Sequence, residues 1–298
     1  MKKLRQYYPI WISIVLVALF LGASLLGSLP LLLWEGAFDH GEYLPQLVVE
    51  LFCLAVMVLL TLILGLGRTF RPGGKRFGEI LLPMLPILLL YFYSAAGQWI
   101  LSCMGQTPLP WDRVLWFVLC MLSVGVTEEL LFRGLITRMI FEKYGTSRVG
   151  AWFSILVSSL LFGAVHLINA ASGMADLGGV LVQMVAAAAL GMSLGAIYLR
   201  TGSLWAVAVL HGLMDLLALL PSGVYGVATM TDMVGGYSWE SLVACLVYVA
   251  LALFLLRPSK LQRVLTVRRE PSQGQVIQLM IVVLLLSGLW SAVLVMSI

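Results

Sequence analysis

The run PIWISIVLVALFLGASLLGSLPLLLW (residues 9–34) contains no charged side chain. A helix needs about 20 consecutive apolar residues to cross the hydrocarbon core of a bilayer, so this run predicts a membrane-spanning helix. Runs of the same kind recur along the chain, which is 61% hydrophobic and 11% charged. Because a soluble domain is about half apolar and roughly a quarter charged, the composition predicts an all-α fold, a polytopic transmembrane helix bundle.

About nine apolar runs are long enough to be membrane spans. They form a single membrane domain over residues 1–298, without a soluble part to which an activity could be assigned. Only a short turn, residues 200–203, separates the sixth span from the seventh, which predicts a tight helical hairpin. The predicted spans are residues 9–34, 44–66, 80–104, 114–141, 149–168, 180–199, 204–220, 241–256 and 276–296.

Basic and acidic residues alternate between successive loops. If the N-terminus is cytoplasmic, basic residues fall in every second loop, as the positive-inside rule requires. The intervening loops are acidic and contain Arg113 as their one basic residue. This sorting predicts a cytoplasmic N-terminus, and together with the short loops it indicates an integral protein of a bacterial plasma membrane. The basic residues are Lys2, Lys3, Arg5, Arg68, Arg71, Lys75, Arg76, Arg138, Lys143, Arg148, Arg200, Arg257, Lys260, Arg263, Arg268 and Arg269.

The net charge of +4 is concentrated in these loops. Such placement indicates contact with membrane lipid, and we expect no nucleic-acid partner. The long basic connection, residues 257–275, could dock on anionic lipid, although a solvated cytoplasmic loop is the simpler interpretation. Nothing in the sequence indicates an oligomeric state.

Three short polar motifs interrupt the apolar runs. A charged side chain at the centre of a membrane helix costs roughly 2.5 to 3.5 kcal/mol on insertion scales, so such residues are candidates for function. The fourth span contains TEELLFR (residues 127–133), the fifth contains FGAVH (162–166) and the seventh contains HGLMD (211–215). The candidate site residues are Glu128, Glu129, Arg133, His166, His211 and Asp215.

Helical geometry predicts how several of these side chains are arranged. Glu129 and Arg133 are four residues apart and share a helix face, so we expect an ion pair with an architectural rather than a chemical role. Glu128 points about 100° away from that face. A carboxylate without an obvious local partner in an apolar setting is a candidate general base. His211 and Asp215 also share a face, where Asp215 could orient the imidazole.

Three further residues bear on this cluster. His166 supplies a second imidazole, but counting along the fifth span places it further out than the others, so tilt or an internal cavity has to close the gap. Phe162 is expected to pack beside the site. Glu50, near the external end of the second span, is expected to snorkel to water and is given no role. From the residues alone, a hydrolase and a proton or ion relay in a transporter both remain open.

The three motifs, in this order and each on a separate predicted span, resemble the CPBP family of intramembrane proteases. This family contains CAAX proteases and bacteriocin-processing enzymes and is also called the Abi family. The resemblance covers residues 114–220, which would be the catalytic core within the membrane domain. It implies an endopeptidase that hydrolyses a peptide bond with a water activated by the first glutamate of the pair, here Glu128.

The resemblance also implies roles for the other motif residues. His166 would help to hold the water or a metal, and His211 with Asp215 would stabilise the oxyanion of the tetrahedral intermediate. Glu129 and Arg133 would support the site as an ion pair. The chain has Asp215 where many family members have asparagine, and an ionised aspartate cannot donate a hydrogen bond to an oxyanion. Asp215 could be protonated in the membrane, position His211 or bind a metal, and we favour the second of these roles.

The resemblance leaves the cofactor open. His166 and His211 together with carboxylates could hold a divalent metal such as zinc, with an open position for water. The H-E-x-x-H motif of soluble zincins is absent from the sequence. A metal-free glutamate mechanism is equally compatible with the resemblance.

The resulting interpretation is an intramembrane endopeptidase whose substrate is a peptide or a membrane protein. A prenylated tail, a bacteriocin leader and a membrane-anchored regulator are all open as substrates, and a bacterial origin disfavours the first. The first alternative is a non-catalytic membrane scaffold or bacteriocin-immunity protein with the same fold. The second is a proton-coupled transporter, which the odd span count and the lack of an internal repeat disfavour, because many transporters are built from paired halves.

Overall fold

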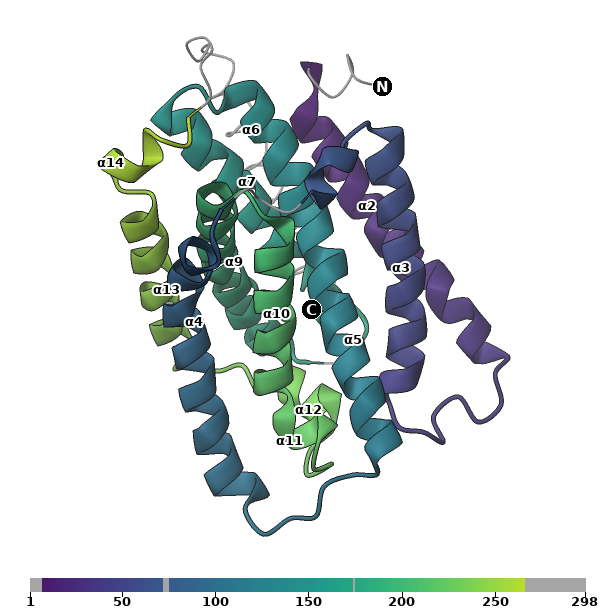
Figure 1. Ribbon diagram of the computed structural model, residues 1–298. Helices are drawn as coiled ribbons and strands as arrows, with labels where there is room; N and C mark the ends of the chain where they lie inside the picture. The colour runs from purple at the N-terminus through teal and green to yellow at the C-terminus, as the bar shows by residue number, and fades with distance from the viewer. Residues whose placement is uncertain (1–6, 72–74, 174, 266–298) are drawn as a thin grey trace.

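The computed structural model describes residues 7–71, 75–173 and 175–265, and these ranges form helices without any strand (Figure 1). The predicted all-α class is confirmed. The longer helices are α2 (Pro9–Ser28), α3 (Tyr43–Ile63), α4 (Phe77–Gln98), α5 (Trp111–Glu129), α6 (Arg138–Tyr144), α7 (Arg148–Val165), α9 (Leu177–Thr201), α10 (Leu204–Ala218) and α13 (Ser241–Leu255). Shorter elements are α8 (Ile168–Ala171), α11 (Leu220–Gly223), α12 (Met230–Gly235), α14 (Pro258–Leu261), the 3₁₀ turns η1 (Leu29–Leu32) and η2 (Gly67–Phe70), and the π-helical turns η3 (Trp99–Cys103) and η4 (Leu130–Thr137).

Six helical stretches in the described part of the chain are long and apolar enough to cross a membrane, and they coincide with the first six predicted spans. Two shorter apolar helices, α10 and α13, occupy the predicted seventh and eighth spans. The ninth predicted span, residues 276–296, lies outside the described residues. The total of nine spans and the cytoplasmic N-terminus therefore stay predictions. The six stretches are Pro9–Leu32, Tyr43–Ile63, Phe77–Cys103, Trp111–Tyr144, Arg148–Ala171 and Leu177–Thr201.

Helix α10 is shorter than a full membrane crossing. Its 15 residues rise about 22 Å, whereas the hydrocarbon core is roughly 30 Å thick. The backbone leaves the helix at Leu219 and continues into α11, in which Pro221, Ser222 and Gly223 are buried. Such a break at membrane depth is tolerated where the backbone is enclosed by protein or lines a hydrated cavity.

The turn between α9 and α10 forms as predicted. Gly202 follows the last helical residue of α9 with a φ of +68°, in the left-handed region that glycine adopts without strain. Ser203 then caps α10, because its Oγ accepts a hydrogen bond from the Ala206 backbone N–H at 3.2 Å. The chain reverses direction within these residues, and α10 returns through the bundle beside α5 (Figure 1).

Glycines set the spacing of the inner helices. A Cβ placed on Gly125 of α5 would lie 2.5 Å from the backbone nitrogen of Gly212 in α10, so a larger residue would push the two helices apart. A Cβ on Gly163 of α7 would lie 2.5 Å from the carbonyl oxygen of Met184 in α9. Close backbone contact through small residues is a common way for membrane helices to pack.

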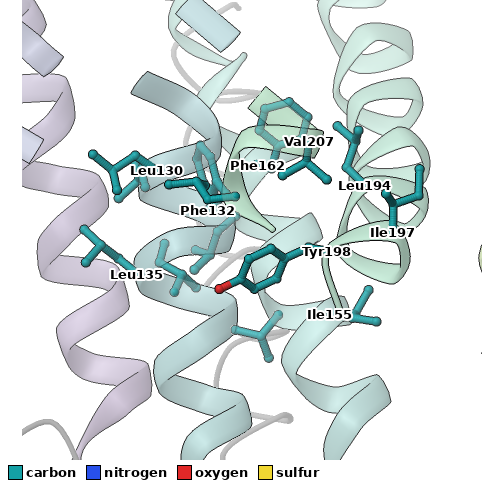
Figure 2. Packing of buried hydrophobic residues seen from close by; sticks show 14 of the residues in the cluster. Leu130, Phe132, Leu135, Ile155, Phe162, Leu194, Ile197, Tyr198 and Val207 are labelled. Carbon is teal, nitrogen blue, oxygen red and sulfur yellow. The ribbon is translucent and has the colours of Figure 1, made fainter. Parts of the chain in front are cut away.

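The π-helical turn η4 interrupts the run from α5 to α6. All eight of its residues are buried, and Leu130, Phe132 and Leu135 belong to one apolar core with residues of α7, α9 and α10 (Figure 2). The Phe132 carbonyl accepts hydrogen bonds from Thr137 Oγ1 at 2.8 Å and from Ser158 Oγ at 2.7 Å. These hydroxyls satisfy the backbone where the α-helical hydrogen-bond pattern changes. No sequence pattern had predicted this turn.

Candidate active site

His211 of α10 lies against the C-terminal end of α5. Its Nδ1 is 2.9 Å from Oε1 of Glu129, and its Nε2 is 3.8 Å from Oε2 of Glu128. The helices come this close because Gly125 and Gly212, each near these residues on its own helix, are in backbone contact. Residues from two of the three motifs are therefore brought together by one helix crossing.

Glu129 and Arg133 form a buried ion pair, as predicted. Nη1 of Arg133 is 2.5 Å from Oε1 of Glu129, and both side chains are enclosed by protein. Nη2 donates to the carbonyl of Gly191 in α9 at 3.1 Å, and the guanidinium carbon lies 4.7 Å from the centre of the Phe162 ring. Because a buried charge is tolerated only when it is paired and hydrogen-bonded, these contacts hold Glu129 in place.

Glu129 also orients His211, a contact that sequence reasoning missed. Since Glu129 is paired with a guanidinium, it accepts the 2.9 Å hydrogen bond, and the proton is assigned to Nδ1 of His211. Nε2 then faces Glu128 at 3.8 Å and Asp215 at 3.6 Å. The contact depends on how α5 crosses α10, and residue spacing within one helix carries no signal of it.

Glu128 has different surroundings from its neighbour Glu129. The side chain of Glu128 is 18% exposed and that of Asp215 is 27% exposed, whereas Glu129 is fully buried. The separations of Glu128 and Asp215 from His211 Nε2 exceed a direct hydrogen bond, and a water molecule could bridge them. Glu128 therefore lies in a largely enclosed position in which part of its side chain stays exposed.

Phe162 packs against both imidazoles, which confirms its expected position beside the site. Its ring centre is 5.4 Å from that of His166 and 5.7 Å from that of His211, both in edge-on geometry. Helix α7 ends at Val165, so His166 lies at the helix C-cap, where its Nδ1 donates to the Phe162 carbonyl at 2.9 Å. Because both imidazoles contact the same Phe162 ring, His166 lies near His211, and the gap that counting along the span had predicted is closed.

A cavity of about 520 Å³ lies beside these rings, between α4, α9, α10 and α13. His166, His211 and Asp215 line this site cavity, together with Phe162. Glu129 and Arg133 are buried behind His211. Glu128 is not among the described residues that line the cavity. Its Oε2 is 3.8 Å from Nε2 of His211, which does line the cavity. Other side chains lining the site cavity include Tyr91, Ser94, Gln98, Gln183, Tyr237 and Tyr248.

Glu50 is buried, so the expectation that it would reach water is wrong. It is 8% exposed, and its Oε1 accepts a hydrogen bond from Gln46 Nε2 at 3.1 Å. Its Oε2 has no hydrogen-bond partner among the described residues. Helix α3, on which Glu50 lies, packs against α5, the helix that carries Glu128 and Glu129. A further carboxylate thus lies near the site.

The described residues do not fit a zinc site with three protein ligands. No group of three or more His, Cys, Asp or Glu side chains in these ranges is arranged to hold a metal ion. Nδ1 of His166 is occupied by the Phe162 carbonyl, and Nδ1 of His211 by Glu129. Metal binding by His166 and His211 stays a prediction.

A comparison with protein-family models found a match that covers the part of the chain that contains the three motifs. Residues 110–217 match the family model described as type II CAAX prenyl endopeptidase, Rce1-like. The match confirms the resemblance to CAAX proteases. All six predicted site residues lie inside this CAAX-protease segment. The family match supports a membrane protease, and the match together with the six apolar helices supports an integral membrane protein. No curated protein and no solved structure matched the chain.

Proposed function

We propose that the chain is an intramembrane endopeptidase of the CPBP type, which hydrolyses a peptide bond with a water activated by Glu128. The observation that carries this proposal is the setting of His211. Its Nδ1 is held by Glu129, while its Nε2 faces Glu128 and Asp215 beside a cavity of about 520 Å³. The family match supplies the reaction class.

In the proposed reaction, Glu128 removes a proton from water as the water oxygen bonds to the carbonyl carbon of the peptide. The carbonyl oxygen becomes an oxyanion, to which His211 in its doubly protonated form donates a hydrogen bond from Nε2. Glu128 then gives the proton to the amide nitrogen as the carbon–nitrogen bond breaks. The products are an amine and a carboxylic acid, so one water is consumed for each bond cleaved.

The remaining motif residues would act on these groups. The Glu129–Arg133 pair fixes the direction of the His211 ring through the 2.9 Å hydrogen bond from Nδ1. Asp215, 3.6 Å from Nε2, would keep that nitrogen protonated and pointed at the site cavity. His166 donates from Nδ1 to a backbone carbonyl, which leaves its Nε2 as an acceptor for the attacking water.

The site cavity suits a peptide that has lost its helical hydrogen bonds. Backbone amides in a membrane interior need hydrogen-bond partners, and a protease needs its substrate backbone unfolded around the scissile bond. Tyr91, Ser94, Gln98, Gln183 and Tyr248 supply hydroxyl and amide groups along the cavity wall. We therefore expect the substrate to be a membrane-anchored protein or its released peptide.

Activity measurements on a Glu128→Gln variant test this proposal. The full chain, reconstituted in phosphatidylcholine and phosphatidylglycerol vesicles, is incubated with a fluorescence-quenched peptide library and the products are identified by mass spectrometry. Removing the general base should lower the cleavage rate by about 100-fold or more. Glu240→Gln is the matched control, because it makes the same change on an exposed carboxylate at the start of α13 and should leave the rate unchanged.

The same preparation separates the alternatives. Cleavage that survives dialysis against a chelator would support the metal-free form of the mechanism. If Glu128→Gln cleaves as fast as the unmodified protein, Glu128 is not the base and the mechanism is wrong. A cellular phenotype that Glu128→Gln leaves intact would favour a scaffold, whereas proton flux that depends on Glu128 would favour a transporter.

A further inference from the structure

A second cavity, of about 450 Å³, lies at the opposite end of the helix bundle from the site cavity. Helix α4 contributes Glu79, near its start, to this cavity, and Gln98, its last residue, to the site cavity. Helix α9 contributes Gln183 near its start to the site cavity and Tyr198 near its end to the second one. The two cavities are therefore separated along the axes of the same two helices.

The second cavity is strongly basic. Five basic side chains and one carboxylate, Glu79, line it, and we call it the basic cavity. Its cations come from four parts of the chain that meet at one end of the bundle, where α6 and α14 lie in the upper part of Figure 1. The basic side chains are Lys75, Arg138, Arg200, Lys260 and Arg263.

Two contacts show how these charges are held together. Arg200 lies near the end of α9, and its Nη1 donates a 3.0 Å hydrogen bond to the carbonyl of Leu255, the last residue of α13. This bond holds the end of α13, and with it the start of α14, beside the end of α9. Arg138 is paired with Glu142, at 3.0 Å. The neighbouring charges of Arg263 and Arg200 lower the pKa of Lys260. This end of the bundle therefore has an excess of positive charge that an anion would relieve.

The lining also contains apolar groups. Phe141, Leu199 and Val264 lie beside the cations, and the ring of the largely buried Tyr198 forms part of the wall. Arg200 lies one residue before the end of the apolar stretch Leu177–Thr201, and Lys75 comes just before the stretch that begins at Phe77. Basic residues beside the ends of apolar helices are expected near the lipid headgroups. Basic pockets between membrane helices at this level are suited to anionic headgroups, and apolar neighbours suit the glycerol and the upper acyl chain.

We propose that the basic cavity binds the phosphate group of an anionic phospholipid. The recognised chemistry is a phosphate that carries net negative charge, which a free phosphate ion shares, whereas the apolar part of the lining favours the lipid. This site is independent of the proposed protease activity, since none of its residues belongs to the three motifs.

Binding of short-chain lipids to the full chain in detergent tests the proposal. Dioctanoyl phosphatidylglycerol, dioctanoyl phosphatidylcholine and inorganic phosphate are titrated separately, with thermal unfolding and native mass spectrometry as readouts. We expect phosphatidylglycerol to bind and to raise the unfolding temperature, and the zwitterionic phosphatidylcholine to bind more weakly. In Lys260→Gln/Arg263→Gln, the apparent affinity for phosphatidylglycerol should fall by about 10-fold or more, because two charged contacts to one phosphate are lost.

A matched double variant, Arg68→Gln/Arg71→Gln, removes the same charge from exposed residues at the same end of the bundle that do not line the basic cavity. It should bind phosphatidylglycerol like the unmodified protein. Lys75→Gln, on a different part of the lining, provides a second variant with an expected smaller loss. If inorganic phosphate binds as tightly as the lipid and displaces it, the ligand is a free phosphate. No binding of either, or an equal loss in both double variants, would overturn the proposal.

Discussion

The first three membrane helices and the next three differ in what surrounds them. In an apolar 18-residue segment of each stretch that includes α2, α3 or α4, 22–33% of the residues are buried, against 44–67% in the corresponding segments of the stretches that include α5, α7 and α9. The CAAX-protease segment covers the second group and α10, which packs against it. Both groups have the hydropathy of membrane spans. Their difference shows that burial within protein, rather than hydropathy, distinguishes the helices that hold the site.

The largest expected effect is on the crossing of α5 and α10. In Gly125→Val, the new side chain meets backbone atoms of Ala208 and Gly212, which cannot move out of the way as a flexible side chain can. We expect the helices to separate, cleavage to fall below detection and the unfolding temperature to drop. Gly22→Val in α2 is the matched control, because nothing lies within 4 Å of a Cβ at that position. Equal effects of the two variants on cleavage and unfolding would refute the distinction between inner and outer helices.

A smaller but still large effect is expected at the buried ion pair. Arg133→Met leaves Glu129 as a buried charge without its partner, which typically costs about 3–5 kcal/mol. The variant should unfold at a lower denaturant concentration and lose the fixed orientation of His211, so cleavage should also decrease. Arg113→Met removes a half-buried arginine whose Nη2 donates to the Asp39 carbonyl at 3.0 Å and which has no carboxylate partner among the salt bridges of the described residues, so its effect on both measurements should be slight. A stability of Arg133→Met equal to that of the unmodified protein would contradict the pairing.

The smallest effect is expected from apolar truncations, which compare the two groups directly. Leu194 of α9 is fully buried, whereas Leu82 of α4 is exposed on the bundle surface. Leu194→Ala leaves a cavity and should cost stability at the lower end of the roughly 2–5 kcal/mol seen for such changes, because lipid is as apolar as leucine. Leu82→Ala removes contacts with lipid only and should change the unfolding midpoint little. A larger loss of stability in Leu82→Ala than in Leu194→Ala would contradict the distinction between the buried inner helices and the exposed outer ones.

Interactions within one helix could be predicted from the sequence, because helix geometry is regular. The four-residue spacing of Glu129 and Arg133 was enough to predict their ion pair. The short link that contains Gly202 was enough to predict the reversal between α9 and α10. Apolar runs likewise predicted each of the six long helices.

Interactions between helices could not be predicted in the same way. The hydrogen bond from His211 to Glu129 joins residues 82 positions apart and depends on two glycines whose contact has no signature in the local sequence. The prediction that Glu50 reaches water failed for the same reason. Hydropathy gives the position of Glu50 along α3, but it does not tell which neighbouring helix packs against that face. Glu128 illustrates the limit within the site, because its motif did not indicate that His211 lines the site cavity while Glu128 does not.

The π-helical turn η4 has a consequence for how substitutions in this region should be interpreted. Each residue added to a helix rotates everything after it by about 100° relative to what comes before. A helical wheel drawn over Trp111–Tyr144 as one regular α-helix would therefore place the side chains after Thr137 in the wrong direction relative to those before Leu130. Removing a single residue from the second half of this turn, residues 134–137, would shift the phase of α6 against α7 while leaving the three motifs unchanged, so an intact set of motifs would not guarantee an intact site.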